Sequence, residues 1–236
     1  MKRLGVNIDH IATLRNARGD LSTSSLLRAI KICEKSKVEI ITVHLREDRR
    51  HINDNDLIAI KKNSKIPINL EMALTKEMID IALKIKPKYI CIVPEKRKEI
   101  TTEGGIDLNR ISKKNLNNLR NACLKNKICL GAFVNPDKMQ ILTAKNLGFD
   151  SVEIHTGSLN NKKIYKKDIL KISESIKFAK KNNLIVNVGH GLNFRNLFYL
   201  KPKKLIDTVH IGHFVVSESI FISLKNVVLK IRKIIK

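Results

Sequence analysis

Histidines and carboxylates recur at one kind of place in this sequence, directly after short stretches of apolar, often β-branched residues. Six of the seven histidines have this placement, which chance scatter would not favour. They are His10, His44, His51, His155, His190 and His213. Imidazole titrates near neutral pH, so a cluster of such residues can both remove and return protons. A single histidine is more often a hydrogen-bonded structural residue, but six together favour acid–base catalysis.

Glu71 ends an apolar stretch in the same way, after Ile68-Asn69-Leu70. A buried carboxylate is costly unless an opposite charge pairs with it or its pKa rises. The sequence therefore predicts for Glu71 either a raised pKa with a role in proton transfer or a salt bridge to an arginine.

Glycines and arginines indicate a phosphorylated ligand. Only ten glycines occur, yet Gly189-His190-Gly191 and Gly212-His213 follow the last two apolar stretches. In β/α barrels the loops after strands seven and eight often bind phosphate through backbone N–H groups. Arg18 and Arg46 present planar donor groups that suit a phosphate, although each suits an ion pair equally well.

These residues need elements that bring them together. Short β-branched stretches alternate with longer stretches of helical spacing along the whole chain, which is typical of β–α–β units around a parallel sheet. The predicted strands are Leu4–Ile8, Glu39–Leu45, Ile66–Leu70, Tyr89–Val93, Ile128–Phe133, Ser151–Ile154, Leu184–Val188 and Thr208–Ile211. The predicted helices are Ser22–Lys35, Asp54–Lys62, Thr75–Lys84, Ser112–Lys125, Pro136–Leu147, Lys163–Lys181, Asn193–Leu200 and a last helix from about Ser217 to Ile235. We expect Pro136 in the first turn of its helix.

Eight such units in 236 residues favour a closed (β/α)8 TIM barrel over an open doubly wound sheet, which commonly has five or six strands. No linker composition divides the chain, so we expect residues 1–236 to form a single domain. Both architectures place ligands outside the carboxyl ends of the strands, where the histidines are predicted to lie.

The formal net charge of +24 is large. The lysines are spread over predicted helix faces and turns, which indicates a solvated surface that attracts anionic substrates rather than a nucleic-acid groove. Binding of RNA or DNA remains an alternative. The sequence shows no signal peptide and no apolar run of membrane-spanning length, so we expect a cytoplasmic protein with no membrane contact.

Metals and nucleotide cofactors are not signalled. The sequence contains neither a GxGxxG motif after the first strand nor a GxxxxGK[ST] motif. His44, Glu71 and His190 are metal-ligating residue types that could converge from different strands, but no local ligand motif supports a metal site. The four cysteines show no CxxC spacing and lie in apolar segments, which favours buried free thiols.

Seven sequence segments carry a resemblance to a known family. They are GVNIDHIATLRNARG from Gly5, ITVHLREDRRHI from Ile41, NLEMA from Asn69, VPEKRKEITTEGG from Val93, EIHTG from Glu153, VNVGHGL from Val186 and IGH from Ile211. Over nearly its whole length the sequence resembles the pyridoxine 5′-phosphate synthase family of deoxyxylulose-dependent vitamin B6 biosynthesis. The resemblance implies condensation of 3-amino-2-oxopropyl phosphate with 1-deoxy-D-xylulose 5-phosphate to pyridoxine 5′-phosphate, phosphate and water, with no metal or organic cofactor.

The resemblance also implies a role for each matching residue. His44 and Glu71 would act as bases, His190 as the proton donor, and Glu153 as a stabiliser of charged intermediates. The implied residues for the amino-ketone phosphate are Asn7, Arg18, Gly191, Gly212 and His213. Those for the deoxyxylulose phosphate are Asp9, His10, Arg46, His51 and Thr101. The family further implies a homo-octamer, although the high positive charge opposes self-association unless anions screen it.

Two rival functions remain open from the sequence. One is a nucleic-acid-binding protein that retains the barrel as a scaffold, for which the charge is the motive. The other is a different phosphate-handling reaction, such as that of a metal-assisted aldolase or epimerase.

Overall fold

Eight short parallel strands pair side by side in chain order, and β8 closes the ring on β1. The computed structural model describes residues 1, 3–19, 22–95 and 104–236 of the chain. The strands are β1 (Arg3–Asn7), β2 (Ile40–His44), β3 (Ile68–Met72), β4 (Tyr89–Ile92), β5 (Cys129–Val134), β6 (Ser151–His155), β7 (Ile185–Gly189) and β8 (Thr208–Ile211). The predicted TIM barrel is confirmed, and every predicted strand lies within two residues of the observed one.

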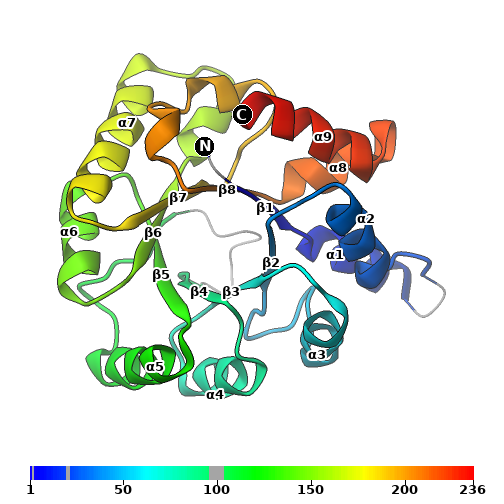
Figure 1. Cartoon of the computed structure of the whole chain (residues 1–236), viewed down its shortest axis with the longest axis horizontal. Coiled ribbons are helices and arrows are strands. Elements are labelled where there is room, and N and C mark those ends of the chain that lie inside the picture. The colour runs from blue at the N-terminus through cyan, green and yellow to red at the C-terminus, as the bar shows by residue number, and fades with distance from the viewer. Residues whose placement is uncertain (2, 20–21, 96–103) are drawn as a thin grey trace.

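The α-helices lie outside the ring of strands (Figure 1). They are α1 (Asp9–Arg18), α2 (Leu26–Lys35), α3 (Asp54–Asn63), α4 (Lys76–Ile85), α5 (Lys113–Asn126), α6 (Lys138–Asn146), α7 (Lys166–Lys181), α8 (His213–Ile222) and α9 (Leu224–Ile235). Hydroxyl, carboxyl or amide side chains cap the first turns of several helices, such as Ser25 at α2 and Asn53 at α3. These caps satisfy N–H groups that have no partner within the helix.

The two faces of each strand differ in chemistry. Outward-facing residues such as Leu4, Val152 and Val186 are fully buried beneath the helices and form the hydrophobic core. Many inward-facing residues are small or polar, beside the apolar Ile40 and Ile185. They include Gly5, Thr42, Asn69, Cys91, Gly131, Ser151, Glu153, Asn187, Gly189, Thr208 and His210. Most TIM barrels fill this space with layers of branched apolar side chains. Here the barrel axis is polar, and it leads into the carboxyl ends of the strands.

Four helix predictions need correction. The sequence analysis predicted no helix at Asp9–Arg18, which forms α1. The predicted helix Asn193–Leu200 is only a 3₁₀ turn, η3 (Asn196–Tyr199). The predicted last helix is two helices that break at Ser223, which has a φ of 70°. Pro136 precedes the capping residue of α6 and lies outside the helix.

Three further observations concern the described part of the chain. Cys33, Cys91 and Cys123 are buried, Cys129 is half-buried, and all four are free thiols, as predicted. No described helix is long and apolar enough to cross a membrane. Thr101, which the family resemblance assigned to substrate binding, lies outside the described residues.

Candidate active site

A pocket of about 380 Å³ opens at the carboxyl ends of the strands. This volume lies within the usual range for small-molecule sites. The residues that line it are Asn7, Asp9, His10, His44, Arg46, His51, Glu71, Val93, Phe133, Glu153, Asn160, His190, Gly191, His210, Ile211, Gly212 and His213. Twelve of the fourteen candidate residues are therefore brought together around one pocket. Arg18 is not among the lining residues; it is the last residue of α1 and is exposed.

His44 and Glu71 lie next to each other at the pocket. They are register partners at the ends of β2 and β3. The backbone N–H of His44 donates a hydrogen bond of 3.0 Å to Oδ1 of Asp9, which follows β1. The Nε2 atom of His44 lies 3.0 Å from Oε1 of Glu95, and both side chains are 6% exposed. His44 is thus held from two sides by carboxylates that come from different strands.

Two carboxyl groups lie in the mouth of the barrel, where Glu153 is buried and Glu71 is half-buried. Burial, followed by the charges of Glu153 and Asp9, raises the pKa of Glu71 well above its ordinary value. Burial raises the pKa of Glu153 to about 8. Between the two interpretations of Glu71, the geometry favours the raised pKa, because no ion pair joins Glu71 to an arginine in the described ranges. Both groups are therefore poised to hold protons near neutral pH.

His210 lies next to Glu153. Its Nε2 atom is 3.8 Å from Oε2 of Glu153, and its Nδ1 atom is 2.9 Å from Oγ1 of Thr42. Burial lowers the pKa of His210 to about 3, so the ring is neutral at physiological pH. Two glycines make room for these side chains. A Cβ at Gly189 would lie 2.0 Å from Oε1 of Glu153, and a Cβ at Gly5 would lie 2.4 Å from Nδ1 of His210.

His190 stands in a strained turn after β7. Its φ is 74°, in the left-handed region that non-glycine residues rarely adopt. Such strain costs on the order of 1 to 3 kcal/mol and persists only where surrounding contacts enforce it. Oγ1 of Thr156 donates to the backbone carbonyls of Gly189 and His190, each at 2.7 Å, and so fixes this turn. The ring of His155 lies 4.9 Å from that of His190 and outside the pocket lining, and burial lowers the pKa of His155 to about 4.

Histidines and helix N-termini gather on the side of the pocket formed by the ends of β8 and β1, between His190 and His44. The His10 and His213 rings meet edge to face, with centroids 5.1 Å apart. These residues open α1 and α8, whose first N–H groups carry partial positive charge. Gly191 and Gly212 line the same side. Asn7 connects this side to His44, because its Nδ2 atom donates to Oδ2 of Asp9 at 2.8 Å. The arrangement suits an anionic group such as phosphate.

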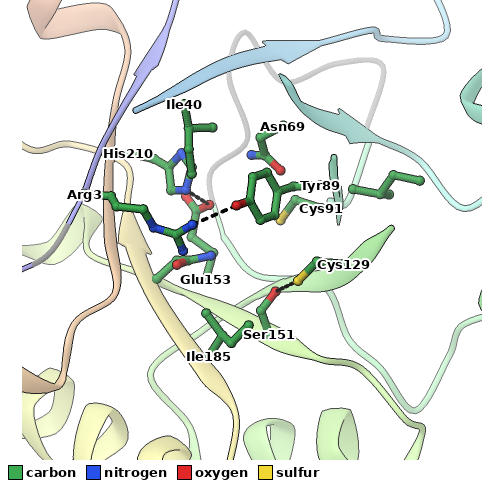
Figure 2. Close-up of a pocket in the computed structure, with 12 residues that line it drawn as sticks. Arg3, Ile40, Asn69, Tyr89, Cys91, Cys129, Ser151, Glu153, Ile185 and His210 are labelled. Carbon is green, nitrogen blue, oxygen red and sulfur yellow. Dashed lines mark hydrogen bonds and ion pairs between the residues drawn. The ribbon is translucent and has the colours of Figure 1, made fainter. Parts of the chain in front are cut away.

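A second, much smaller cavity lies at the amino-terminal ends of the strands (Figure 2). Its volume is about 10 Å³, about the room that one water molecule needs. Arg3 crosses this end of the barrel and donates to the hydroxyl of Tyr89 at 2.8 Å. Glu153 and His210 contribute to both cavities, so they separate the small cavity from the larger pocket.

The described residues contain no group of three or more His, Cys, Asp or Glu side chains arranged to hold a metal ion. His44, Glu71 and His190 do line one pocket, but the nearest partners of His44 are the carboxylates of Glu95 and Asp9.

Sequence reasoning missed two residues at the candidate site. His210 was placed inside a strand and received no role, yet it forms part of the pocket. Glu95 received no role in the sequence analysis, yet it contacts His44. The alternation of β8 indicates an inward-facing His210, since Val209 must face the core. No sequence signal pairs Glu95 with His44, because that contact depends on how two non-adjacent strands are placed.

Comparison with solved structures supports the fold. 3-Hexulose-6-phosphate synthase superposes with a TM-score of 0.67 at 13% identity, over 99% of this chain and 100% of the other. N-(5′-phosphoribosyl)anthranilate isomerase from Pyrococcus furiosus gives a TM-score of 0.64 at 16% identity, over 100% and 98% of the two chains. At such low identity these likenesses establish the fold alone.

Sequence comparison is more specific. A relative from Pelagibacter ubique named pyridoxine 5′-phosphate synthase is 44% identical, over 97% of this chain and 96% of its own. A relative of the same name from Zymomonas mobilis is 42% identical, over 98% and 90%. The model of the family described as pyridoxal phosphate biosynthesis protein PdxJ matches residues 4–236. The chain therefore belongs to the PdxJ family of enzymes of vitamin B6 biosynthesis.

Proposed function

We propose that this enzyme condenses 3-amino-2-oxopropyl phosphate with 1-deoxy-D-xylulose 5-phosphate to form pyridoxine 5′-phosphate, inorganic phosphate and water. The observation that carries the proposal is the convergence of His44, Glu71, Glu153 and His190 on one pocket of about 380 Å³. The family membership adds the relatives' shared name. Both substrates are anions, which suits a pocket that two helix N-termini and Arg46 border.

The reaction needs several proton transfers between fixed partners. The amine of one substrate and the ketone of the other first form an imine with loss of water. Enolisation, departure of inorganic phosphate from the deoxyxylulose part, ring closure and loss of a second water follow, and these steps move protons to or from carbon, nitrogen or oxygen. Groups held in place around both substrates make these transfers effectively intramolecular. The pocket supplies two imidazoles and two carboxyls for them.

The four groups receive distinct roles. His44 and Glu71, side by side on neighbouring strands, act as the bases. His190 donates a proton from the opposite wall, and Glu153 at the floor stabilises cationic intermediates. Glu71 and Glu153 are mostly protonated in the empty pocket, because burial raises the pKa of each. The ammonium group of the amino-ketone brings a positive charge that favours their ionised forms, so substrate binding itself activates them.

The remaining lining residues hold the two phosphates. Asn7, Gly191, Gly212 and His213 surround the amino-ketone phosphate. Asp9, His10, Arg46 and His51 lie on the side of the deoxyxylulose phosphate, and we assign Thr101 to it as well. Arg18 remains a candidate ligand of the amino-ketone phosphate, but its position at the exposed end of α1 requires a movement to reach it.

The test is turnover by the purified protein. Mixing it with both phosphorylated substrates should release phosphate and produce the fluorescence of pyridoxine phosphate. Near-isosteric variants His44→Asn and Glu71→Gln should each lower kcat on the order of 100- to 10,000-fold, the usual contribution of a general acid or base. Variants that fold normally and turn over at the unchanged rate would reject the assigned roles. Activity that disappears on chelation would favour a metal-assisted reaction instead.

Three further properties of the chain belong to the same proposal. We expect residues 1–236 to unfold as a single domain, the protein to work in the cytoplasm, and copies of the chain to assemble into an octamer. Sedimentation at several salt concentrations tests the assembly, since the charge of +24 makes self-association depend on screening anions.

A further inference from the structure

We propose that Glu95 is a positioning residue that fixes the proton of His44 on Nε2 and leaves Nδ1 as the nitrogen that accepts a proton from substrate. The inference rests on the proposed function, since it concerns the residue assigned there as a base. It adds a residue that sequence analysis gave no catalytic part and that does not line the pocket.

The contacts of Glu95 show how it is held. Its Oε1 atom lies 3.0 Å from Nε2 of His44, and its Oε2 atom accepts a 3.0 Å hydrogen bond from the backbone N–H of Glu47. Both partners belong to β2 and the segment after it, whereas Glu95 follows β4. β3, which carries Glu71, lies between these two strands in the ring. Glu95 therefore reaches across the end of β3 and ties the end of β4 to the end of β2.

The protonation state of Glu95 decides which nitrogen of His44 carries the proton. Burial raises the pKa of Glu95, but hydrogen bonds from His44 and from the backbone of Glu47 outweigh burial and leave the pKa below its ordinary value. An ionised carboxylate can only accept hydrogen bonds. Nε2 of His44 must therefore donate. In the neutral ring, Nδ1 then carries no proton and has the lone pair that can accept one.

His44 has little freedom to escape this arrangement. Its side chain is 6% exposed, and its backbone N–H is bonded to Oδ1 of Asp9. A nearby carboxylate also favours uptake of a proton by the ring, because it stabilises the imidazolium that forms. Glu95 thus combines two effects on a general base, a fixed tautomer and a compensating charge.

Replacement by glutamine gives an unusually sharp test. The backbone N–H of Glu47 can only donate, so the amide oxygen of the introduced side chain must face it. The amide NH₂ group then points at Nε2 of His44, which has to accept, and the ring proton moves to Nδ1. Glu95→Gln therefore inverts the tautomer with almost no change in volume. Glu95→Ala, by contrast, removes both contacts and leaves the ring free to adopt either tautomer.

The expected order of activities distinguishes positioning from packing. If Glu95 fixes the tautomer, Glu95→Gln lowers kcat on the order of 100-fold with KM changed by less than about threefold, and it is less active than Glu95→Ala. If Glu95 served only to fill space, the near-isosteric amide would be the milder change. The control Glu174→Gln, on the exposed face of α7, should leave kcat unchanged.

A second measurement does not depend on turnover. Nitrogen-15 NMR of the histidine rings, assigned by comparison with His44→Asn, should show the neutral His44 protonated on Nε2 in the unchanged protein and on Nδ1 in Glu95→Gln. A proton on Nδ1 in the unchanged protein, or Glu95→Ala less active than Glu95→Gln, overturns the proposal. If the unchanged protein forms no pyridoxine phosphate, the proposed function fails, while the NMR comparison still decides the role of Glu95.

Discussion

Replacing the buried carboxyl of Glu153 by an amide should flatten the dependence of stability on pH. Glu153 is 5% exposed, and burial raises its pKa from 4.5 to about 8. Between these two values the folded protein keeps a proton that the unfolded chain has released. The stabilising contribution of this group is therefore fully present below pH 4.5 and is lost as the pH rises through 8. Glu153→Gln has no such group and should not lose this stability.

The size of the effect follows from linkage. One group with this shift lowers the free energy of unfolding by about 1.4 kcal/mol per pH unit. Buried histidines such as His51 and His210, whose pKa values fall to about 3, act in the opposite direction, but only up to the ordinary histidine pKa of about 6.5. Burial, the largest cause of the raised pKa of Glu71, acts in both proteins alike. From pH 6.5 to 8 the stability of Glu153→Gln relative to the unchanged protein should therefore grow by about 2 kcal/mol.

Urea unfolding followed by circular dichroism at three pH values in this range measures the difference directly. The surface variant Glu174→Gln makes the same exchange of carboxyl for amide on the exposed face of α7. Its free energy of unfolding should depend on pH in the same way as that of the unchanged protein. If the free energy of unfolding of Glu153→Gln also followed that of the unchanged protein across this pH range, Glu153 would already be ionised in the empty pocket. The view that burial keeps this carboxyl protonated would then be wrong.

Three other predictions concern packing, thiols and anion binding. Gly189→Ala should cost about 1 to 3 kcal/mol of stability and lower activity, because its Cβ would overlap Oε1 of Glu153. The control Gly104→Ala, whose Cβ would have its nearest contact at 3.8 Å, should change the urea midpoint little. The four cysteines, whose thiol pKa values burial raises, should resist alkylation at pH 8 until the protein is unfolded, as mass spectrometry would detect. Inorganic phosphate should raise the unfolding temperature, and His213→Ala should reduce that rise, as a thermal shift series would show. If phosphate raised the unfolding temperature of both proteins equally, His213 would not be part of the anion site.

The strands could be predicted closely from the sequence because two independent signals coincide in each. β-Branched residues mark the strand, and the following polar or glycine residues mark its end. The same coincidence located most of the pocket, since His44, Glu71 and His190 end their strands or follow them directly. Arg18 was assigned from its residue type and from the resemblance, and it is absent from the pocket lining because no strand end holds it there.

The errors among the helices have physical causes. Only Asp9 and Ala12 are buried in α1, so this helix has no apolar stripe for periodicity to detect, and no side chain caps its start. The break at Ser223 places a non-glycine residue at positive φ, where its hydroxyl accepts from the backbone of Asn226 and caps α9. Apolar residues continue on both sides of this serine, so the sequence pattern shows one helix where the structure has two.

The polar axis of the barrel explains why the burial of Glu153 is hard to predict from its own strand. Alternation of polar and apolar residues along a strand ordinarily indicates a sheet with one face in water. In β6 the alternation Ser151-Val152-Glu153-Ile154 occurs in a closed ring, so the apolar face meets the helices and the polar face meets the other strands. Because the helices cover the apolar faces of all eight strands, the polar faces point into the closed ring. The burial that raises the pKa of Glu153 is thus a consequence of ring closure, which is a property of all eight strands together.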